Sequence, residues 1–264
     1  MRAFLVGQDG LYESDLPLPG DPDPSDVLIQ TKAMSLNSRD LLVAAGNYGR
    51  VMCNPFIAGS DMAGTVIKVG DRVTGFKEGD SVLNAPFRHW PAGKINADWM
   101  GTLIGGAGID GVLADQVCYP AGALVHMPAQ YSFQEAVTLP IAGLTAWAGV
   151  MTHGRVKPGE WVLLHGTGGV SIFAAQIARI AGARVILSTS SIEKARLVKD
   201  RFGVMETIDY KENNWPKKVR NITGGRGVDL VVDVAGGQTF TQSVKACALN
   251  ARISLIGILD GYES

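Results

Sequence analysis

The spacing of apolar residues changes along the chain, and the first part is β-rich. Residues 26–34, 63–69 and 80–83 alternate apolar and polar side chains, which is typical of half-buried strands. Residues 15–24 contain four prolines and predict a loop. Residues 84–111 have no periodicity and predict a long irregular loop, which in a compact domain is more often functional than accidental.

From about residue 128 the pattern predicts alternating helices and strands. Helical spacing over residues 133–153 is broken by Pro140, which predicts two helices. Strands are then predicted at 161–165, 184–188, 228–233 and 251–257, and helices at 170–181, 191–201 and 238–248. This alternation indicates parallel strands covered by helices on both faces, which is a doubly wound α/β sheet.

The turn that follows the strand at 161–165 is rich in glycine. A strand, a glycine-rich turn and a helix in this order let backbone N–H groups approach a pyrophosphate at the helix N-terminus. Ser171 stands where the usual fingerprint has its third glycine, so the match is incomplete, and a turn without a ligand is the alternative. The predicted backbone contacts are Gly166, Gly168, Gly169 and Val170.

The end of the second predicted strand indicates which dinucleotide binds. An acidic residue about 20 residues after the turn usually accepts the ribose hydroxyls of NAD. Here that segment reads Ser188, Thr189, Ser190 and Ser191, without a carboxylate. Small hydroxyls leave room for a 2′-phosphate, and Lys194 could supply positive charge, so we expect NADP(H). The alternative is that Ser190 or Ser191 only caps the next helix.

Composition and charge narrow the class of protein. The 264 residues are 46% apolar and 19% charged, which suits two folded domains. A net charge of −1 gives no general attraction to nucleic acid or anionic membranes. No apolar run approaches 18 residues, so we expect a cytoplasmic protein with no membrane partner. Cys53, Cys118 and Cys247 match neither a disulfide framework nor a zinc spacing.

Several longer segments carry a family resemblance. They are SLNSRDLL (35–42), AGSDMAGTVIKVGDRVTGFKEGDSV (58–82), TLPIAGLTAW (138–147), VKPGEWVLLHGTGGVS (156–171) and TGGRGVDLVVDVAGG (223–237). With them the chain resembles the zinc-independent, quinone-oxidoreductase-like branch of the medium-chain dehydrogenase/reductase superfamily. The resemblance implies a GroES-like β-barrel catalytic domain over residues 1–125 and a Rossmann domain over residues 126–264, with the active site in the cleft between them.

The resemblance also locates the positions that hold catalytic zinc in zinc-dependent relatives. In this chain they are Asn37, Ser60 and Ile141, with Asp61 beside Ser60. These side chains cannot supply the thiolates and imidazole that zinc prefers, and the four-cysteine structural lobe of such relatives is missing. The sequence therefore predicts a protein without zinc.

Three residues of the first domain are catalytic candidates. Asn37 resembles the family's asparagine on the nicotinamide side, and its alternative role is a helix N-cap. Tyr48 could donate a hydrogen bond to a developing oxyanion, or could only pack. Asp61 could act as an acid if its pKa were raised, or could be a structural carboxylate. Arg39 and Asp40 are expected to form a structural ion pair.

The remaining candidates belong to the second domain. The resemblance implies that Thr145 binds the cofactor from a helix under the nicotinamide, unless its hydroxyl bonds back to the preceding turn. It implies that Tyr210 lies near the adenosine 2′-phosphate, while His165 is expected to pack below the turn. The ends of two predicted strands are expected to line the nicotinamide ribose with Ala235, Gly236 and Gly257.

Members of the family usually continue beyond the point where this chain stops. The continuation adds a sixth Rossmann strand and completes the catalytic domain, so we expect this chain to be C-terminally truncated. An uncovered sheet edge predicts lower stability and a weakened homodimer contact.

Together these inferences predict an enzyme that acts on a small molecule. It is expected to transfer hydride between NADP(H) and a quinone, enone or related carbonyl compound, without zinc and without a nucleic-acid partner. Alcohol dehydrogenase-type activity and a non-catalytic cofactor-binding remnant are the alternatives.

Overall fold

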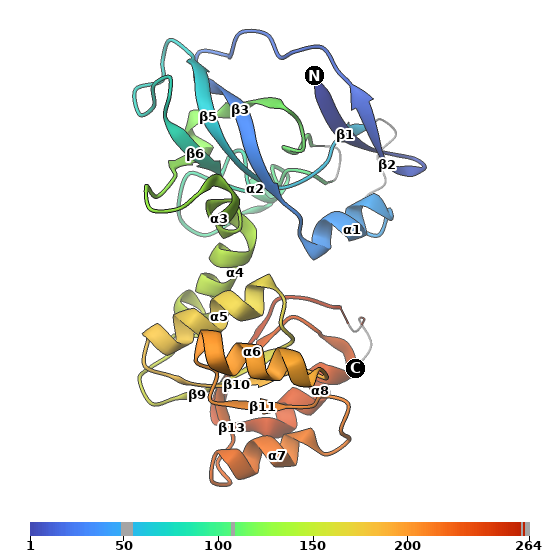
Figure 1. The fold of residues 1–264 in the computed structure, drawn as a ribbon, viewed down its shortest axis with the longest axis vertical. Coiled ribbons are helices and arrows are strands. Elements are labelled where there is room, and N and C mark those ends of the chain that lie inside the picture. The colour runs from blue at the N-terminus through green and yellow to red at the C-terminus, as the bar shows by residue number, and fades with distance from the viewer. Residues whose placement is uncertain (49–54, 107–108, 260, 262–264) are drawn as a thin grey trace. The chain divides into compact units, whose positions relative to one another are not determined.

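The computed structural model describes residues 1–48, 55–106, 109–259 and 261. Cys53 lies outside these residues. The chain separates into two compact units, Met1–Ile141 and Ala142–Ser264, and each has its own sheets (Figure 1). Below, the two are called the first unit and the second unit.

The first unit is built from antiparallel strands. One sheet has the order β2-β1-β4, and a five-stranded sheet has the order β7-β3-β5-β6-β8. The strands are β1 (Arg2–Gly7), β2 (Gly10–Asp15), β3 (Asp26–Ser35), β4 (Phe56–Ile57), β5 (Asp61–Val69), β6 (Ser81–Asn84), β7 (Gln116–Pro120) and β8 (Leu124–His126). The helices are α1 (Ser38–Ala44), α2 (Ala97–Met100) and α3 (Phe133–Ala136), with a 3₁₀ turn at Ala121–Ala123. The strands predicted from alternation are confirmed as β3, β5 and β6.

Close packing between β3 and β5 explains one glycine of the first unit. Gly64 pairs with Thr31 across the two strands. A Cβ atom at Gly64 would lie 2.5 Å from Ile29 and 2.6 Å from the carbonyl oxygen of Gln30. No side chain fits there, so glycine permits the close approach of the strands.

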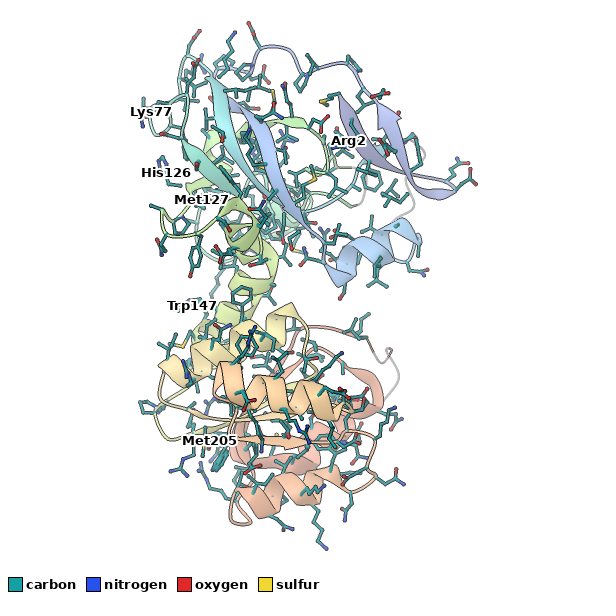
Figure 2. The ribbon with its side chains drawn as sticks, in the orientation of Figure 1. Arg2, Lys77, His126, Met127, Trp147 and Met205 are labelled. Carbon is teal, nitrogen blue, oxygen red and sulfur yellow. The ribbon has the colours of Figure 1, made fainter. Side chains whose placement is uncertain are left out.

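The connection between β5 and β6 is held by polar contacts at its tip. Lys77 Nζ lies 2.6 Å from Asp80 Oδ1, and His126 of β8 places Nε2 3.1 Å from the Gly75 carbonyl oxygen (Figure 2). The His126 and Phe76 rings pack with their centroids 4.6 Å apart. These contacts fix the turn that leads into β6.

The second unit contains one parallel sheet of order β11-β10-β9-β12-β13. Its strands are β9 (Trp161–His165), β10 (Arg184–Ser188), β11 (Glu206–Ile208), β12 (Val228–Asp233) and β13 (Cys247–Leu255). Its main helices are α5 (Gly169–Ile180), α6 (Ile192–Phe202), α7 (Trp215–Ile222) and α8 (Gly237–Ala246). The doubly wound sheet is confirmed, while β11 was not predicted because three residues are too few to show a period.

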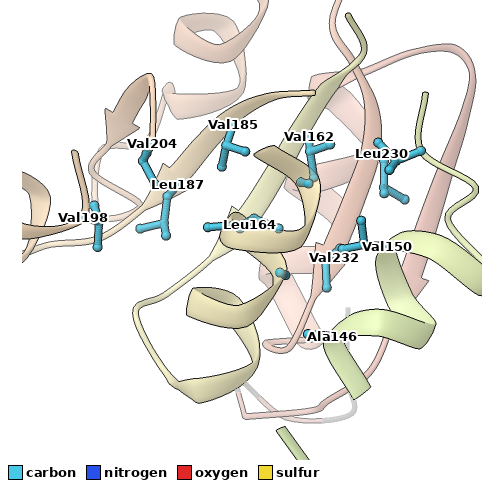
Figure 3. Close-up of a cluster of buried hydrophobic side chains, with 14 residues drawn as sticks. Ala146, Val150, Val162, Leu164, Val185, Leu187, Val198, Val204, Leu230 and Val232 are labelled. Atoms are coloured by element: carbon cyan, nitrogen blue, oxygen red, sulfur yellow. The ribbon is translucent and has the colours of Figure 1, made fainter. Parts of the chain in front are cut away.

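Neighbouring residues of each central strand enter opposite hydrophobic layers. Val162 and Leu164 of β9 pack in the cluster that contains residues of α5 and α6 (Figure 3). Leu163, between them, belongs to the cluster that contains Trp215 of α7 and Ala246 of α8. Strand side chains alternate in direction, so a strand covered on both faces is apolar throughout.

The segment interrupted by Pro140 forms two helical pieces. After α3, helical turns resume at Leu139–Gly143 and continue through α4 (Leu144–Trp147) to Ala148–Thr152, with wider π-type turns on both sides of α4. Pro140 lies in the first turn of the second piece, where its missing N–H has no intrahelical acceptor. Within the described residues, no helix is long and apolar enough to cross a membrane.

The buried layers predict a large difference between two isoleucines. Ile186 of β10 has 0% exposure, whereas Ile180 at the end of α5 is 82% exposed. We expect Ile186→Ala to lower the free energy of unfolding by about 2–5 kcal/mol, because it leaves a cavity. The matched control Ile180→Ala should change it by less than about 0.5 kcal/mol. Urea denaturation followed by circular dichroism measures both, and equal losses would contradict the assignment of the core.

Candidate functional site

Asn37 and Asp61 meet where β3, α1 and β5 come together. Asn37 is the N-cap residue of α1, and its backbone N–H donates to Asp40 Oδ2 at 2.7 Å. Its side-chain Nδ2 donates to Asp61 Oδ2 at 2.9 Å. Antiparallel pairing of Ser35 with Asp61 brings the two segments together. Asn37 therefore occupies the capping position and also presents its amide to a buried carboxyl group.

Asp61 is fully buried, and this changes its protonation. Desolvation raises the pKa of Asp61 to about 7, and the nearby Asp40 carboxylate contributes in the same direction. The Asn37 amide, the Ile141 backbone and the Arg39 guanidinium oppose the rise. Among the described residues, none makes a hydrogen bond of ordinary geometry to Asp61 Oδ1. The raised pKa that an acid role requires is present.

Ser60 joins the side chains of Arg39 and Asp40. The Ser60 hydroxyl donates to Asp40 Oδ1 at 3.2 Å and accepts a hydrogen bond from Arg39 Nη1. Arg39 Nη1 also donates to the Ile104 carbonyl oxygen at 3.0 Å. The predicted Arg39–Asp40 ion pair is therefore wrong: in the described part of the chain the two side chains meet at Ser60 instead of pairing directly, because the buried hydroxyl lies between them.

Tyr48 packs beside this cluster. Its ring centroid lies 5.0 Å from the Arg39 guanidinium carbon, a cation–π arrangement, and the residue is 37% exposed. The ring thus has a packing role, while its exposure leaves the phenol accessible. The geometry of Tyr48 thus fits both the packing role and the hydrogen-bond donor role.

Asn84 supports the cluster and was missed in the sequence. It is buried at the end of β6, where its Oδ1 accepts from the Met62 N–H at 2.7 Å. Its Nδ2 donates to the Ser60 carbonyl oxygen at 2.8 Å. Asn84 therefore fixes the backbone on both sides of Asp61. The available signal was an amide residue that directly follows an apolar strand.

The residues at the zinc-ligand positions do not fit zinc. Asn37 contacts Asp61, and the Ile141 backbone lies close enough to influence the Asp61 carboxyl group. Zinc sites require thiolate, imidazole or several carboxylate donors, and here an amide, one carboxyl group and an aliphatic side chain come together. In addition, a guanidinium cation already contacts Ser60. Across residues 1–48, 55–106, 109–259 and 261, no group of three or more His, Cys, Asp or Glu could hold a metal ion.

In the second unit, the glycine-rich turn lies at the carboxyl ends of the parallel strands. Gly166 has φ of +73°, which favours glycine, and Gly168 is the N-cap of α5. The amides of the first helical turn have no intrahelical acceptor and are suited to bind an anion. Ser171, at the position of the missing third glycine, donates its hydroxyl hydrogen bond to the His165 carbonyl oxygen at 2.6 Å. The turn thus has the local structure that the sequence predicted.

Two of the predicted cofactor residues at the end of β10 face the interior. Ser188 is buried, and its Oγ lies 3.0 Å from His165 Nδ1 and 3.3 Å from the Gly166 nitrogen. Thr189 is also buried, and its Oγ1 accepts from the Ser191 N–H at 3.3 Å. Both hydroxyls are engaged inside the unit, and their contact with a dinucleotide stays a prediction.

The other predicted residues of this region are at the surface. Ser190 Oγ donates to Tyr210 Oη at 3.2 Å, and both residues are exposed. Ser191 caps α6, because its Oγ accepts from the Lys194 N–H at 3.2 Å and donates to Glu193 at 2.8 Å. Of the two serines considered as caps, Ser191 has this role, and Ser190 pairs with the tyrosine.

The loops after β12 and β13 approach each other closely. Asp233 is buried at the end of β12, and its Oδ1 accepts from the N–H groups of Ala235 and Gly236 at 2.8 and 3.0 Å. A Cβ atom at Gly257 would lie 2.4 Å from the Val234 carbonyl oxygen. The structure thus brings Ala235, Gly236 and Gly257 together at the carboxyl edge of the sheet.

Thr145 lies half-buried on α4. Within the described residues its hydroxyl makes no hydrogen bond back to the preceding helical turn. The hydroxyl is therefore available for another partner.

Two protein families match the chain. The family described as "Alcohol dehydrogenase GroES-like domain" matches residues 23–129. The family described as "Zinc-binding dehydrogenase" matches residues 169–264. The two matches fall on the antiparallel first unit and the parallel second unit, and they confirm the fold class with its GroES-like N-terminal domain.

Two curated relatives cover nearly the whole chain. A zinc-type alcohol dehydrogenase-like protein of Schizosaccharomyces pombe is 40% identical over 97% of this chain and 74% of its own length. The quinone oxidoreductase of Rattus norvegicus is 30% identical over 100% of this chain and 75% of its own length. Both relatives therefore extend the similarity across both units.

Solved structures have the same fold. An NAD-dependent alcohol dehydrogenase is 36% identical with a TM-score of 0.90, and the match covers 100% of this chain and 79% of that one. A mycobacterial protein solved in complex with NADPH is 32% identical with a TM-score of 0.83, and the match covers 100% of this chain and 76% of that one. With both units and their motifs matched, the chain belongs to the medium-chain dehydrogenase/reductase superfamily, a family of oxidoreductases.

Proposed function

We propose that the protein is an NADP(H)-dependent oxidoreductase that transfers hydride between the nicotinamide and a quinone, enone or other carbonyl compound without zinc. The observation that carries the choice of cofactor is the exposed pair of Ser190 and Tyr210 hydroxyls at the end of β10. In this fold, NAD-binding enzymes usually have a carboxylate at this position. Hydroxyl groups can donate hydrogen bonds to a phosphate, whereas a carboxylate repels it.

The surroundings of this pair are also suited to a 2′-phosphate. Lys194 is exposed in the first turn of α6, where the helix dipole adds positive potential. The one acid of that turn, Glu193, is held by the Ser191 hydroxyl. The similar mycobacterial protein that binds NADPH supports this assignment. A similar enzyme uses NAD, so the preference depends on the residues at the end of β10.

The rest of the dinucleotide is assigned to three segments of the second unit. The turn formed by Gly166, Gly168, Gly169 and Val170 would hold the pyrophosphate through backbone N–H groups. Thr145 and the loops that contain Ala235, Gly236 and Gly257 would hold the nicotinamide ribose. Ser188 would support the turn from the interior of the unit, because its hydroxyl contacts the Gly166 nitrogen and the His165 ring.

The first unit would supply the groups that handle the acceptor. Bound NADPH supplies the hydride. Asn37 donates one N–H to Asp61 and keeps a second N–H for the acceptor oxygen. Asp61, whose pKa is raised to about 7, is fully buried and would therefore deliver a proton from Oδ1 through a water. The Tyr48 phenol would be a second donor to the developing oxyanion.

The cofactor assignment predicts a preference that one substitution reverses. Titration of the five tryptophans' fluorescence should show tighter binding of NADPH than of NADH. We expect Ser190→Asp to weaken NADPH binding by about tenfold or more, because the new carboxylate repels the 2′-phosphate, with no loss of NADH affinity.

Ser190→Asn is the matched control, since it adds a side chain of the same shape without charge. It should weaken NADPH binding much less than Ser190→Asp. Tighter NADH binding by the unmodified chain would contradict the assignment.

The acid role of Asp61 predicts the direction of a pH effect. A general acid must be protonated, so reduction of quinones and enones by NADPH should slow as the pH rises through about 7. Asp61→Asn should lower kcat by about 10²–10⁴ and remove this pH dependence. Steady-state NADPH oxidation with a panel of quinones and enones measures both effects, and binding without turnover would instead favour a non-catalytic protein.

Asp80→Asn is the control for the pH profile of the activity, because Lys77 keeps the pKa of Asp80 below its ordinary value, away from this pH range.

The stability of the fold gives a second measurement of the Asp61 pKa. Its pKa is 3.8 in the unfolded chain and about 7 when folded, so the folded state holds the proton between these values. The free energy of unfolding should therefore fall as the pH rises from about 4 to 7, and this slope should be smaller in Asp61→Asn.

The donor set predicts that the purified protein contains no stoichiometric zinc. Asn37, Ser60 and Ile141 offer neither thiolate nor imidazole, so dialysis against a chelator should change neither the activity nor the melting temperature. Atomic emission spectroscopy measures the metal content. One tightly bound zinc per chain would overturn the proposal of a metal-free reaction.

A further inference from the structure

A buried histidine links two cofactor loops of the second unit. His165 is the last residue of β9, and both of its ring nitrogens have serine partners. Nδ1 lies 3.0 Å from Ser188 Oγ on β10, and Nε2 lies 2.8 Å from Ser243 Oγ on α8. The ring also packs edge-on against Trp215, with 5.6 Å between centroids. The imidazole is therefore held from three sides.

Each of the two serines is connected by hydrogen bonds to a different loop. The N–H of Gly166, the first glycine of the turn after β9, is shared by two acceptors of Ser188: the carbonyl oxygen at 3.0 Å and Oγ at 3.3 Å. Ser243 Oγ lies 3.4 Å from Asp233 Oδ2, and Asp233 Oδ1 accepts from two backbone N–H groups of the loop after β12. The chain of hydrogen bonds thus runs from the glycine-rich turn to the loop that contains Ala235 and Gly236.

Counting protons assigns a direction to these bonds. Besides His165, Ser243 Oγ contacts the Thr239 carbonyl oxygen at 2.9 Å and the Asp233 carboxylate, and both of these can only accept. If the single hydroxyl proton of Ser243 goes to one of them, the Ser243 oxygen can accept from His165 Nε2–H, whereas donation to His165 would leave both of these acceptors facing Ser243 without a proton. Burial lowers the pKa of His165, which favours the neutral ring. Nδ1 of that ring is then an acceptor, and Ser188 donates to it.

We propose that His165, as the Nε2–H tautomer, is a positioning residue that couples the turn after β9 to the loop after β12. This inference rests on the proposed function, which assigns the turn to the pyrophosphate and the loop to the nicotinamide ribose. The bonds from the Gly166 N–H through Ser188, His165 and Ser243 point the same way and end on the Asp233 carboxylate, which also accepts from the loop after β12. Bonds in such a series polarise one another, so loss of one link weakens the others. A dinucleotide that touches both loops then depends on the whole chain of bonds.

A double-mutant cycle tests this coupling. NADPH affinity is measured by fluorescence titration for Ser188→Ala, Ser243→Ala and the double variant. Each single substitution should weaken binding by about fivefold, because it breaks one internal hydrogen bond. The double variant should be only slightly weaker than either single variant, because one break already uncouples the loops. Additive losses, or no loss in the single variants, would overturn the proposal.

Two further measurements separate coupling from a general loss of structure. Ser171→Ala removes a buried hydroxyl that bonds the His165 carbonyl oxygen and not the ring, so its effect should add to that of Ser243→Ala. In a His165→Phe background, the Ser188→Ala and Ser243→Ala substitutions should lose their mutual dependence. If the His165→Phe variant does not fold, long-range ¹H–¹⁵N correlation of the unmodified protein still reports the tautomer, and an Nδ1–H form would overturn the proposal.

A failure of the loop coupling can be distinguished from a failure of the proposed function. If the unmodified chain binds NADH and not NADPH, the 2′-phosphate assignment fails, and the same cycle is run with NADH, which retains the pyrophosphate and both riboses. Failure to bind either dinucleotide would reject the proposed function and this coupling together.

Discussion

The parallel register of β9, β10 and β12 is the constraint on which the second unit depends. It pairs Ser188 with His165 and Val232 with Leu164, so that three strands end at one edge. Apolar residues fill both faces of the sheet up to that edge, where polar side chains begin. A polar group buried at this edge needs a hydrogen-bond partner, and the polar side chains at the strand ends form hydrogen bonds with one another. This internal pairing leaves the turns beyond them free to bind a ligand.

In the first unit, the corresponding constraint is the burial of one carboxyl group without a metal. Desolvation raises the pKa of Asp61, and Asn37 and the segment fixed by Asn84 hold it in place. In zinc-dependent relatives a zinc cation is bound at this position. Here Arg39 approaches Ser60 instead. The buried carboxyl group with its raised pKa is the feature on which the proposed proton transfer rests.

Periodicity predicted elements whose burial pattern repeats, such as β3, β5, β9, β12 and the long helix α5, but it did not predict β1, β2 or α7. The three-residue β11 and the four-residue α2 are too short to show a period, and they were missed. For the candidate site residues, the sequence predicted some side-chain neighbours and missed others. Ser190 and Tyr210 do lie together, whereas Ser188, two residues before Ser190 and the last residue of β10, faces inward. Which way a side chain points at the end of a strand depends on its neighbours in space.

The sequence by itself determined the class of fold and the family, because both depend on local patterns: alternating strands and helices, a glycine turn between them and long matching motifs. It also determined that zinc donors are missing, since residue type alone decides that. Only the tertiary structure decided that Asp61 is buried enough to hold a proton near neutrality and that His165 bridges two serines. Desolvation and hydrogen-bond partners come from residues distant in sequence, so no local pattern contains them.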